Sequence, residues 1–337
     1  MSVRILVGDV RETLAQLPDA SVQCCVTSPP YFGLRDYGHA GQIGLEQTPD
    51  AYVAELVGVF RDVRRVLRED GTLWLNLGDS YARAGGEGGH GPNAQVGNTK
   101  SLQQRRMLQP PVGCKAKDLL GIPWRVAFAL QADGWYLRSD IIWHKPNPMP
   151  ESVTDRPTKA HEYVFLLTKS ARYYYDAGAI AEVVANTTRE RLSQPSLAQQ
   201  EGSHRVPGKT NGTMKAVPPR FGGTKYGEND APEHRTKSGN EYTFADRRNA
   251  RTVWPIATQP FKGAHFATMP PDLAERCIKA GTKAGDTVLD PFGGAGTTGL
   301  VADRLGRDSV LCELNPTYAA MARDRIKADN PLFSEVA

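Results

Sequence analysis

Short apolar runs alternate with longer amphipathic stretches along most of the chain. The apolar runs have the length of buried strands and are bounded by glycine, proline or polar residues. They predict strands over residues 4–7, 21–26, 72–77, 135–143, 161–168 (continued by 173–175), 288–289 and 309–312. The amphipathic stretches predict helices over residues 13–17, 49–67, 118–133 and 316–328, and two more that begin at residues 272 and 300. Strands that alternate with helices indicate an α/β protein with a mostly parallel sheet.

Three stretches depart from this pattern. Residues 33–47 and 82–113 are rich in glycine and polar side chains, which is typical of flexible loops. Residues 186–262 are rich in Arg, Lys, Gln, Gly, Pro and Asn, and aromatic residues are interspersed among the basic ones. Basic side chains suit phosphates and polar ones suit base edges, so we interpret 186–262 as a nucleic-acid recognition region. A disordered linker is the alternative.

The sequence Ser28-Pro29-Pro30-Tyr31 follows the apolar run 21–26 almost directly. Neither proline can donate a hydrogen bond to a sheet, so the strand must end here. The chain leaves the strand with a hydroxyl, a rigid turn and an aromatic ring, and α/β proteins place their chemistry at such strand ends. The alternative is a strand that ends at a proline and a tyrosine that only packs.

A second motif lies near the other end of the chain, between a predicted strand and a predicted helix. Gly294, Gly296 and Gly299 have the spacing of a nucleotide-binding turn, and Glu313 ends the next strand, where an acidic residue can bind ribose hydroxyls. Asp290, just before the glycines, would repel a pyrophosphate and attract an α-amino group. This favours S-adenosylmethionine over a nicotinamide dinucleotide, and a nicotinamide oxidoreductase is the alternative.

The residues after Gly299 supply too few strands for an open α/β sheet, since only the run 309–312 follows. The missing strands must come from residues 4–175, so both parts of the chain are expected to build one parallel-rich sheet. Four polar residues follow strands and would share its carboxyl edge: Asp9, Ser28, Asp290 and Glu313. Ligands of open α/β sheets bind at that edge.

In this order the two motifs, Ser28-Pro-Pro-Tyr31 and Asp290-Pro-Phe-Gly-Gly-Ala-Gly-Thr297, resemble the amino-group DNA methyltransferases, which act on cytosine N4 or adenine N6. The order is similar to the permuted β arrangement of that family. The resemblance implies a Rossmann-like, circularly permuted S-adenosylmethionine-dependent methyltransferase fold with a loop-rich target-recognition insertion. It divides the chain into a catalytic half (1–185), a target-recognition region (186–262) and a cofactor-binding half (263–337).

The resemblance also implies the site residues. The catalytic residues are Ser28, Pro29, Pro30 and Tyr31. The cofactor-binding residues are Asp9, Phe266, Thr268, Asp290, Phe292, Gly294, Gly296, Thr297, Thr298, Glu313 and Asn315. The family's counterpart of Asp9 binds the amino group of the cofactor's adenine, and this aspartate also suits the N-cap of a helix. Met269 stands where the family usually has phenylalanine.

The mechanism implied by the resemblance is direct methyl transfer to a flipped base. The Ser28 hydroxyl and the Pro29 carbonyl would accept hydrogen bonds from the exocyclic amine, and Tyr31 would stack on the ring. Cytosine-C5 methylation requires a cysteine nucleophile; Cys24 and Cys25 lie within the preceding strand, so that chemistry is excluded.

In the family that the chain resembles, Ser-Pro-Pro-Tyr is found mostly in cytosine-N4 enzymes and Asp-Pro-Pro-Tyr mostly in adenine-N6 enzymes. Ser28 therefore favours cytosine N4 by this resemblance, and adenine N6 is the alternative. A non-catalytic DNA-binding protein and a protein or RNA methyltransferase are weaker alternatives. The expected partners are double-stranded DNA and a candidate cognate restriction endonuclease, with the chain as a monomer or a homodimer.

Charge, cysteine content and the length of the apolar runs indicate the compartment and the ligands to expect. The formal net charge of +4 is compatible with nucleic-acid binding but does not argue for it. The five cysteines form no Cys-x-x-Cys pair, so we expect reduced core cysteines, no metal and a cytoplasmic protein. No apolar run approaches the roughly 18 residues of a membrane span, so we expect no membrane helix. Because the first residues already have the pattern of a strand, we also expect no signal peptide.

Overall fold

The computed structural model describes residues 1–34, 38–39, 41–82, 110–185, 247–259, 268–330 and 335–336. Internal contacts divide the chain into two compact units, Met1–Tyr175 with Thr252–Ala337, and Asp176–Arg251. Most of the predicted recognition region 186–262 lies outside the described residues, as does most of the predicted loop 82–113. Along the chain the first unit resumes at Thr252, so the described residues 252–259 lie in this unit.

The described part of the second unit contains a two-stranded antiparallel ribbon of β6 (Glu182–Val183) and β7 (Arg247–Arg248). The Glu182 carboxylate accepts hydrogen bonds from Arg248 Nη2 at 3.3 Å and Arg251 Nε at 2.9 Å. The ribbon therefore joins the incoming and outgoing chains of this unit.

The first unit is built on a mixed sheet that has, within the described residues, nine strands in the order β11-β1-β10-β9-β2-β3-β5-β4-β8. The strands are β1 (Ser2–Val7), β2 (Val22–Thr27), β3 (Leu67–Leu77), β4 (Tyr136–His144), β5 (His161–Thr168), β8 (Val253–Pro255), β9 (Thr287–Asp290), β10 (Asp308–Glu313) and β11 (Glu335–Val336). The strands from β11 to β3 are parallel, and β5 is antiparallel to both of its neighbours.

Strands from the two ends of the chain alternate within this sheet. β9 and β10 lie between β1 and β2, so that Cys24 pairs with Val288 and Val3 pairs with Ser309. Neither part of the chain can complete the sheet alone, which is the arrangement that the sequence predicts. Because β1, β10, β9 and β2 are parallel, their carboxyl ends meet at one edge.

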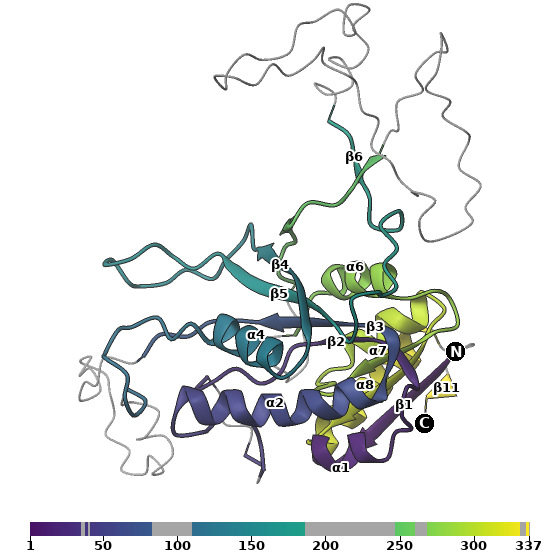
Figure 1. Cartoon of the computed structure of the whole chain (residues 1–337), viewed down its shortest axis with the longest axis horizontal. Coiled ribbons are helices and arrows are strands. Elements are labelled where there is room, and N and C mark those ends of the chain that lie inside the picture. The colour runs from purple at the N-terminus through teal and green to yellow at the C-terminus, as the bar shows by residue number, and fades with distance from the viewer. Residues whose placement is uncertain are drawn as a thin grey trace, which may run out of the picture. The chain divides into compact units, whose positions relative to one another are not determined.

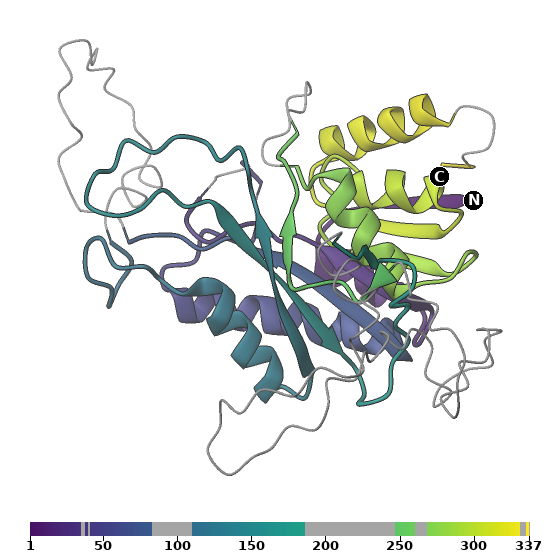
Figure 2. The same cartoon turned by 90° about the horizontal axis from the view of Figure 1, so that it is seen from above.

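Helices cover both faces of the sheet (Figures 1 and 2). One face carries α1 (Val10–Ala15), α2 (Pro49–Val66) and α4 (Ile122–Ala132), which share one hydrophobic core. The other face carries α6 (Pro271–Gly281), α7 (Thr297–Arg304) and α8 (Pro316–Asp329). The sheet is thus buried on both sides, which explains the nearly continuous apolar runs of its parallel strands.

The helix α2 shows how the amphipathic pattern becomes structure. Thr48 caps its first turn by accepting a hydrogen bond from the Ala51 N–H, and Pro49 occupies the first helical position. The side chains at helical spacing are buried on the sheet: Tyr52, Leu56, Val59, Phe60 and Val63. Complete burial of such a side chain contributes about 1.5–3 kcal/mol, so this face decides where the helix lies.

Two strand predictions were wrong. β3 begins at Leu67 rather than at 72, because Leu67 already pairs with Val22 and a register shift before Cys24 accommodates the polar residues between them. Residues 173–175 do not continue β5; they follow it outside the sheet. Tyr175 stacks on Trp74 with ring centroids 6.4 Å apart, and the Tyr174 N–H donates to the Asp70 carbonyl.

In the described part of the chain, no helix has the length and apolar character needed to cross a membrane.

Candidate active site

Two adjoining pockets open at the carboxyl edge of the parallel strands. The larger is lined by nine of the predicted site residues: Asp9, Ser28, Pro29, Pro30, Tyr31, Phe292, Gly294, Glu313 and Asn315. The smaller is lined by seven: Ser28, Thr268, Asp290, Phe292, Gly294, Thr297 and Thr298. Ser28 lines both pockets, as do Phe292 and Gly294, so Ser28 lies where the predicted catalytic turn meets the glycine turn.

Asp290 connects the two motifs. It ends β9 and is only 4% exposed. Its Oδ1 accepts hydrogen bonds from Thr27 Oγ1 at 2.6 Å and the Phe292 N–H at 3.0 Å, while Oδ2 accepts one from Thr298 Oγ1 at 2.7 Å. Burial raises the pKa of this carboxyl, and the donors from Thr27 and Thr298 oppose the rise. A carboxylate offers about four acceptor positions, so one is left for a ligand.

Glu313 is fixed against the glycine turn. Its Oε2 accepts a hydrogen bond from the Gly294 N–H at 2.7 Å, and its Oε1 accepts one from the Asn315 N–H at 2.8 Å. Burial raises the pKa of the Glu313 carboxyl, and the two backbone donors oppose this. The carboxylate is thereby oriented at the pocket wall, with lone pairs left for the hydroxyls of a sugar.

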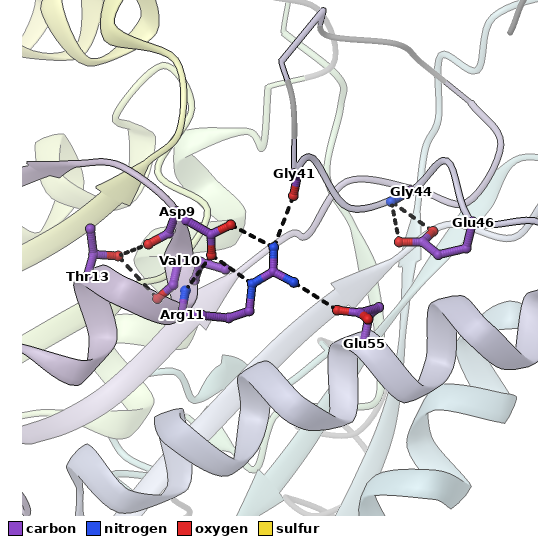
Figure 3. A network of polar contacts seen from close by, with 8 residues as sticks. All are labelled: Asp9, Val10, Arg11, Thr13, Gly41, Gly44, Glu46 and Glu55. Atoms are coloured by element: carbon purple, nitrogen blue, oxygen red, sulfur yellow. Dashed lines mark hydrogen bonds and ion pairs between the residues drawn. The ribbon is translucent and has the colours of Figure 1, made fainter.

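Asp9 is both a helix cap and the centre of a charged network (Figure 3). Its Oδ1 accepts from the Arg11 N–H at 2.9 Å and from Nε at 2.8 Å, and its Oδ2 accepts from Nη2 at 2.6 Å. The Arg11 side chain lowers the pKa of this carboxyl chiefly by hydrogen bonding, so Asp9 stays ionised. The predicted N-cap is confirmed.

Sequence reasoning missed the role of Arg11. Its guanidinium also donates to the Gly41 carbonyl at 3.2 Å and to Glu55 Oε2 at 3.0 Å (Figure 3). Arg11 therefore joins α1 to α2 and to the loop that contains Gly41, a residue of the larger pocket. In the same loop the Gly44 N–H donates to both oxygens of Glu46. A signal was available, because a basic residue in the first turn of a helix opposes the helix dipole unless a carboxylate holds it.

Two hydrogen bonds fix the Ser28–Tyr31 turn to neighbouring elements. The Tyr52 hydroxyl of α2 donates to the Pro30 carbonyl at 2.8 Å, and the Tyr31 hydroxyl donates to Glu162 Oε2 at 2.5 Å. Burial raises the pKa of Tyr31 well above its usual range, and the charge of Glu162 adds to the rise. Tyr31 is therefore a neutral donor. Sequence reasoning missed Tyr52 and Glu162, which lie on elements assigned only to the core.

Gly78 fits closely beneath the Tyr31 ring. A Cβ at position 78 would lie 2.4 Å from Cε2 of Tyr31, so Gly78→Ala must displace the ring. We expect a loss of about 1–3 kcal/mol in the free energy of unfolding, measured by chemical denaturation. Gly58→Ala is the control, because a Cβ there meets nothing within 4 Å and alanine favours the helix. An unchanged denaturation midpoint for Gly78→Ala would show that the ring moves aside freely.

Two predicted cofactor residues differ from the rest. Gly296 is the N-cap of α7 with a φ of 77°, and a Cβ there would lie 2.8 Å from Cβ of Ala322 in α8. Its small size thus allows α7 and α8 to pack closely. Phe266 lies outside the described residues.

Cys24 and Cys25 are unsuited to nucleophilic chemistry. Burial raises the pKa of Cys24 to about 12 and that of Cys25 well above its usual range, and both lie within β2. All five cysteines are free thiols. Within the described residues, no group of three or more His, Cys, Asp or Glu side chains could hold a metal ion.

Comparisons with known proteins agree with this geometry. The N6/N4 model for DNA methylases matches residues 22–324. The type II methyltransferase M.SmaI of Serratia marcescens is 44% identical over 325 residues, which cover 96% of this chain and 91% of that protein.

Two solved structures share the fold. TTHA0409 from Thermus thermophilus, a proposed DNA modification methylase complexed with S-adenosyl-L-methionine, has a TM-score of 0.57 and 25% identity and covers 99% of this chain and 97% of its own. The PvuII DNA methyltransferase (cytosine-N4-specific) has a TM-score of 0.59 and 18% identity, covering 98% of this chain and 91% of its own. Both likenesses confirm the predicted fold class.

Proposed function

This chain belongs to the N6/N4 DNA methylase family, and we propose that it transfers the methyl group of S-adenosylmethionine to the exocyclic N4 of a flipped cytosine in double-stranded DNA. The observation that carries the proposal is the position of Ser28, which lines both pockets. A neutral hydroxyl there can accept a hydrogen bond from an amine without placing a second charge beside Asp290.

The residues of the pockets fit the proposed cofactor. Glu313 offers acceptors for ribose hydroxyls, Asp290 keeps one acceptor position for an α-amino group, and Asp9 suits the adenine amine. The other residues that we assign to the cofactor are Phe266, Thr268, Phe292, Gly294, Gly296, Thr297, Thr298 and Asn315. Bound here, the sulfonium group supplies an activated methyl. The similarity to TTHA0409, whose structure holds this cofactor, supports the assignment.

The residues of the catalytic turn position the base. Ser28 Oγ and the Pro29 carbonyl accept hydrogen bonds from the exocyclic amine and direct its lone pair at the methyl group. The Tyr31 ring stacks on the base, which contributes about 1–3 kcal/mol. Pro29 and Pro30 keep these acceptors rigid, and Tyr52 fixes the turn through the Pro30 carbonyl. The bond between N4 and the methyl carbon would form as the bond between sulfur and that carbon breaks. The neutral thioether would leave and the amine would lose one proton afterwards, so no covalent enzyme intermediate is required.

Nucleoside analysis tests the proposed base. DNA methylated by the purified enzyme is digested to nucleosides and examined by mass spectrometry. We expect N4-methylcytosine. N6-methyladenine without N4-methylcytosine would overturn the choice of base, and the absence of any methylated nucleoside on DNA of diverse sequence would overturn the proposed activity.

We also propose that residues 186–262 recognise the DNA sequence. A deletion that respects the fold removes only residues 186–246, because β6 and β7 then remain a hairpin and β8 keeps its place beside β4. The variant should bind cofactor with unchanged affinity by calorimetry and lose sequence-specific DNA binding by electrophoretic mobility shift. Binding by the full chain should weaken steeply with added salt. Unchanged sequence preference after the deletion would assign recognition to other loops.

The cellular setting belongs to the same proposal. We place the enzyme in the cytoplasm, which contains its substrate DNA and keeps thiols such as its five free cysteines reduced. A cognate restriction endonuclease is its proposed functional partner, in line with the type II methyltransferases that it resembles. Light scattering after gel filtration distinguishes a monomer from a homodimer.

A further inference from the structure

Glu162 lies beneath the catalytic turn and is the point where several polar side chains converge. It stands at the start of β5, and its side chain is only 13% exposed. Oε2 accepts hydrogen bonds from the Tyr31 hydroxyl at 2.5 Å and from Asn76 Nδ2 at 3.1 Å, while Oε1 accepts one from the Lys145 ammonium. A buried carboxylate needs such donors, and this one has three.

The donors around Glu162 have fixed directions. A carboxylate paired with an ammonium accepts hydrogen bonds and donates none, so the proton between it and Tyr31 belongs to Tyr31. Asn76 Nδ2 also donates to the Tyr163 carbonyl at 3.1 Å, so the Asn76 oxygen faces the Tyr31 hydroxyl at 3.3 Å. Tyr31 has one proton to give, and the shorter, charge-assisted bond to Glu162 takes it.

The direction of the Tyr31 proton determines how Ser28 behaves. Ser28 Oγ lies 3.4 Å from Tyr31 Oη. Because the Tyr31 proton points to Glu162, Tyr31 Oη can only accept from Ser28, and the Ser28 proton is turned away from the substrate. The lone pairs of Ser28 are then left for the exocyclic amine, which is a hydrogen-bond donor.

We propose that Glu162 is a positioning residue for methyl transfer. Through the Tyr31 hydroxyl it holds Ser28 as a hydrogen-bond acceptor toward the target amine. This inference rests on the proposed function, since it concerns the orientation of an amine substrate. Sequence gives no sign of it, because Glu162 lies 131 residues from Tyr31 and they meet only when β5 pairs with β3.

The test is a double-mutant cycle with Glu162→Gln and Tyr31→Phe. Glutamine has nearly the same shape as glutamate but carries an amide that donates, so Tyr31 no longer has a fixed acceptor. We expect Glu162→Gln to lower the single-turnover rate about 10–10²-fold at saturating cofactor and DNA, with the cofactor affinity unchanged. In the Tyr31→Phe background the same change should lower the rate less than about threefold, because the hydroxyl through which Glu162 acts is gone.

Glu69→Gln is the control for the loss of a carboxylate that pairs with a lysine, at an exposed position. Glu69 also pairs with a lysine across β3 and the end of β5, through Lys169, but it lies at the opposite end of β3. The single-turnover rate of Glu69→Gln should equal that of the wild type. Thermal unfolding of each variant confirms that the comparison is between folded proteins.

The outcomes separate this inference from the proposed function. Equal rate losses for Glu162→Gln in both backgrounds, or a wild-type rate for Glu162→Gln alone, would overturn the role of Glu162. A wild-type enzyme that produces N6-methyladenine would overturn the proposed base, yet the cycle on that product would still decide whether Glu162 acts through Tyr31.

Discussion

Asp290→Ala will lose cofactor binding and part of its stability together. The substitution removes the shared acceptor of Thr27, Thr298 and the Phe292 N–H, all of which lie around a side chain that is 4% exposed. Each buried group left without a partner costs about 1–3 kcal/mol. We therefore expect a folded variant with a lower denaturation midpoint. Its affinity for S-adenosylmethionine by calorimetry should fall by about 10²-fold or more, because a buried partner of the α-amino group is gone.

Two further variants separate the effect of losing the charge of Asp290 from the effect of losing its hydrogen bonds. Asp290→Asn preserves the shape and most hydrogen bonds, so it should recover stability but not affinity. Asp286→Ala removes a carboxylate beside the opposite end of β9, where it accepts from the Lys283 N–H. That control should bind cofactor normally. Normal binding by Asp290→Asn would show that the charge of Asp290 is not used by the ligand.

The raised pKa of Asp290 gives the same prediction a pH dependence. Burial favours the protonated carboxyl, so on acidification Asp290 takes up its proton at a higher pH than a free aspartate. Protonation removes the charge that attracts the α-amino group. Cofactor affinity should therefore fall as pH decreases through this raised pKa. An affinity that stays constant across the acid range in which the protein remains folded would contradict the role given to this carboxylate.

Ser28→Ala will retain cofactor affinity and lose most of its turnover. Ser28 lines both pockets but forms none of the hydrogen bonds around Asp290 and Glu313. Loss of one preorganised hydrogen-bonding group lowers a rate by about 10²-fold or more, and we expect this loss in the single-turnover rate. The cofactor dissociation constant should change little.

Ser21→Ala provides the control for Ser28. Ser21 stands just before β2, as Ser28 stands just after it, and its hydroxyl donates to the Pro18 carbonyl far from the pocket. It should methylate DNA at the wild-type rate. Wild-type turnover in Ser28→Ala would show that the Pro29 carbonyl alone positions the amine.

Several features of the site were predictable because they depend on local sequence. The prolines after Thr27 must end β2, and the glycines after Asp290 must open a turn before α7. Since parallel strands end at one edge, the strand-end positions of Asp9, Ser28, Asp290 and Glu313 also predicted their common location. The boundaries of β3 and the place of residues 173–175 were not predictable, because pairing with Val22 and packing on Trp74 override the local pattern.

The two motifs, their order and the need for one shared sheet follow from the amino-acid sequence, because strand-ending prolines, glycine spacing and strand number are properties of the chain. The contacts of each polar group in the site depend on how the strands pair in the folded protein. Thr27 contacts Asp290 across a sequence separation of 263 residues, and Tyr31 contacts Glu162 across a separation of 131 residues. Such contacts follow from the pairing of β2 with β9 and of β3 with β5. The directions of the hydrogen bonds that join Ser28, Tyr31 and Glu162 depend on these strand pairings.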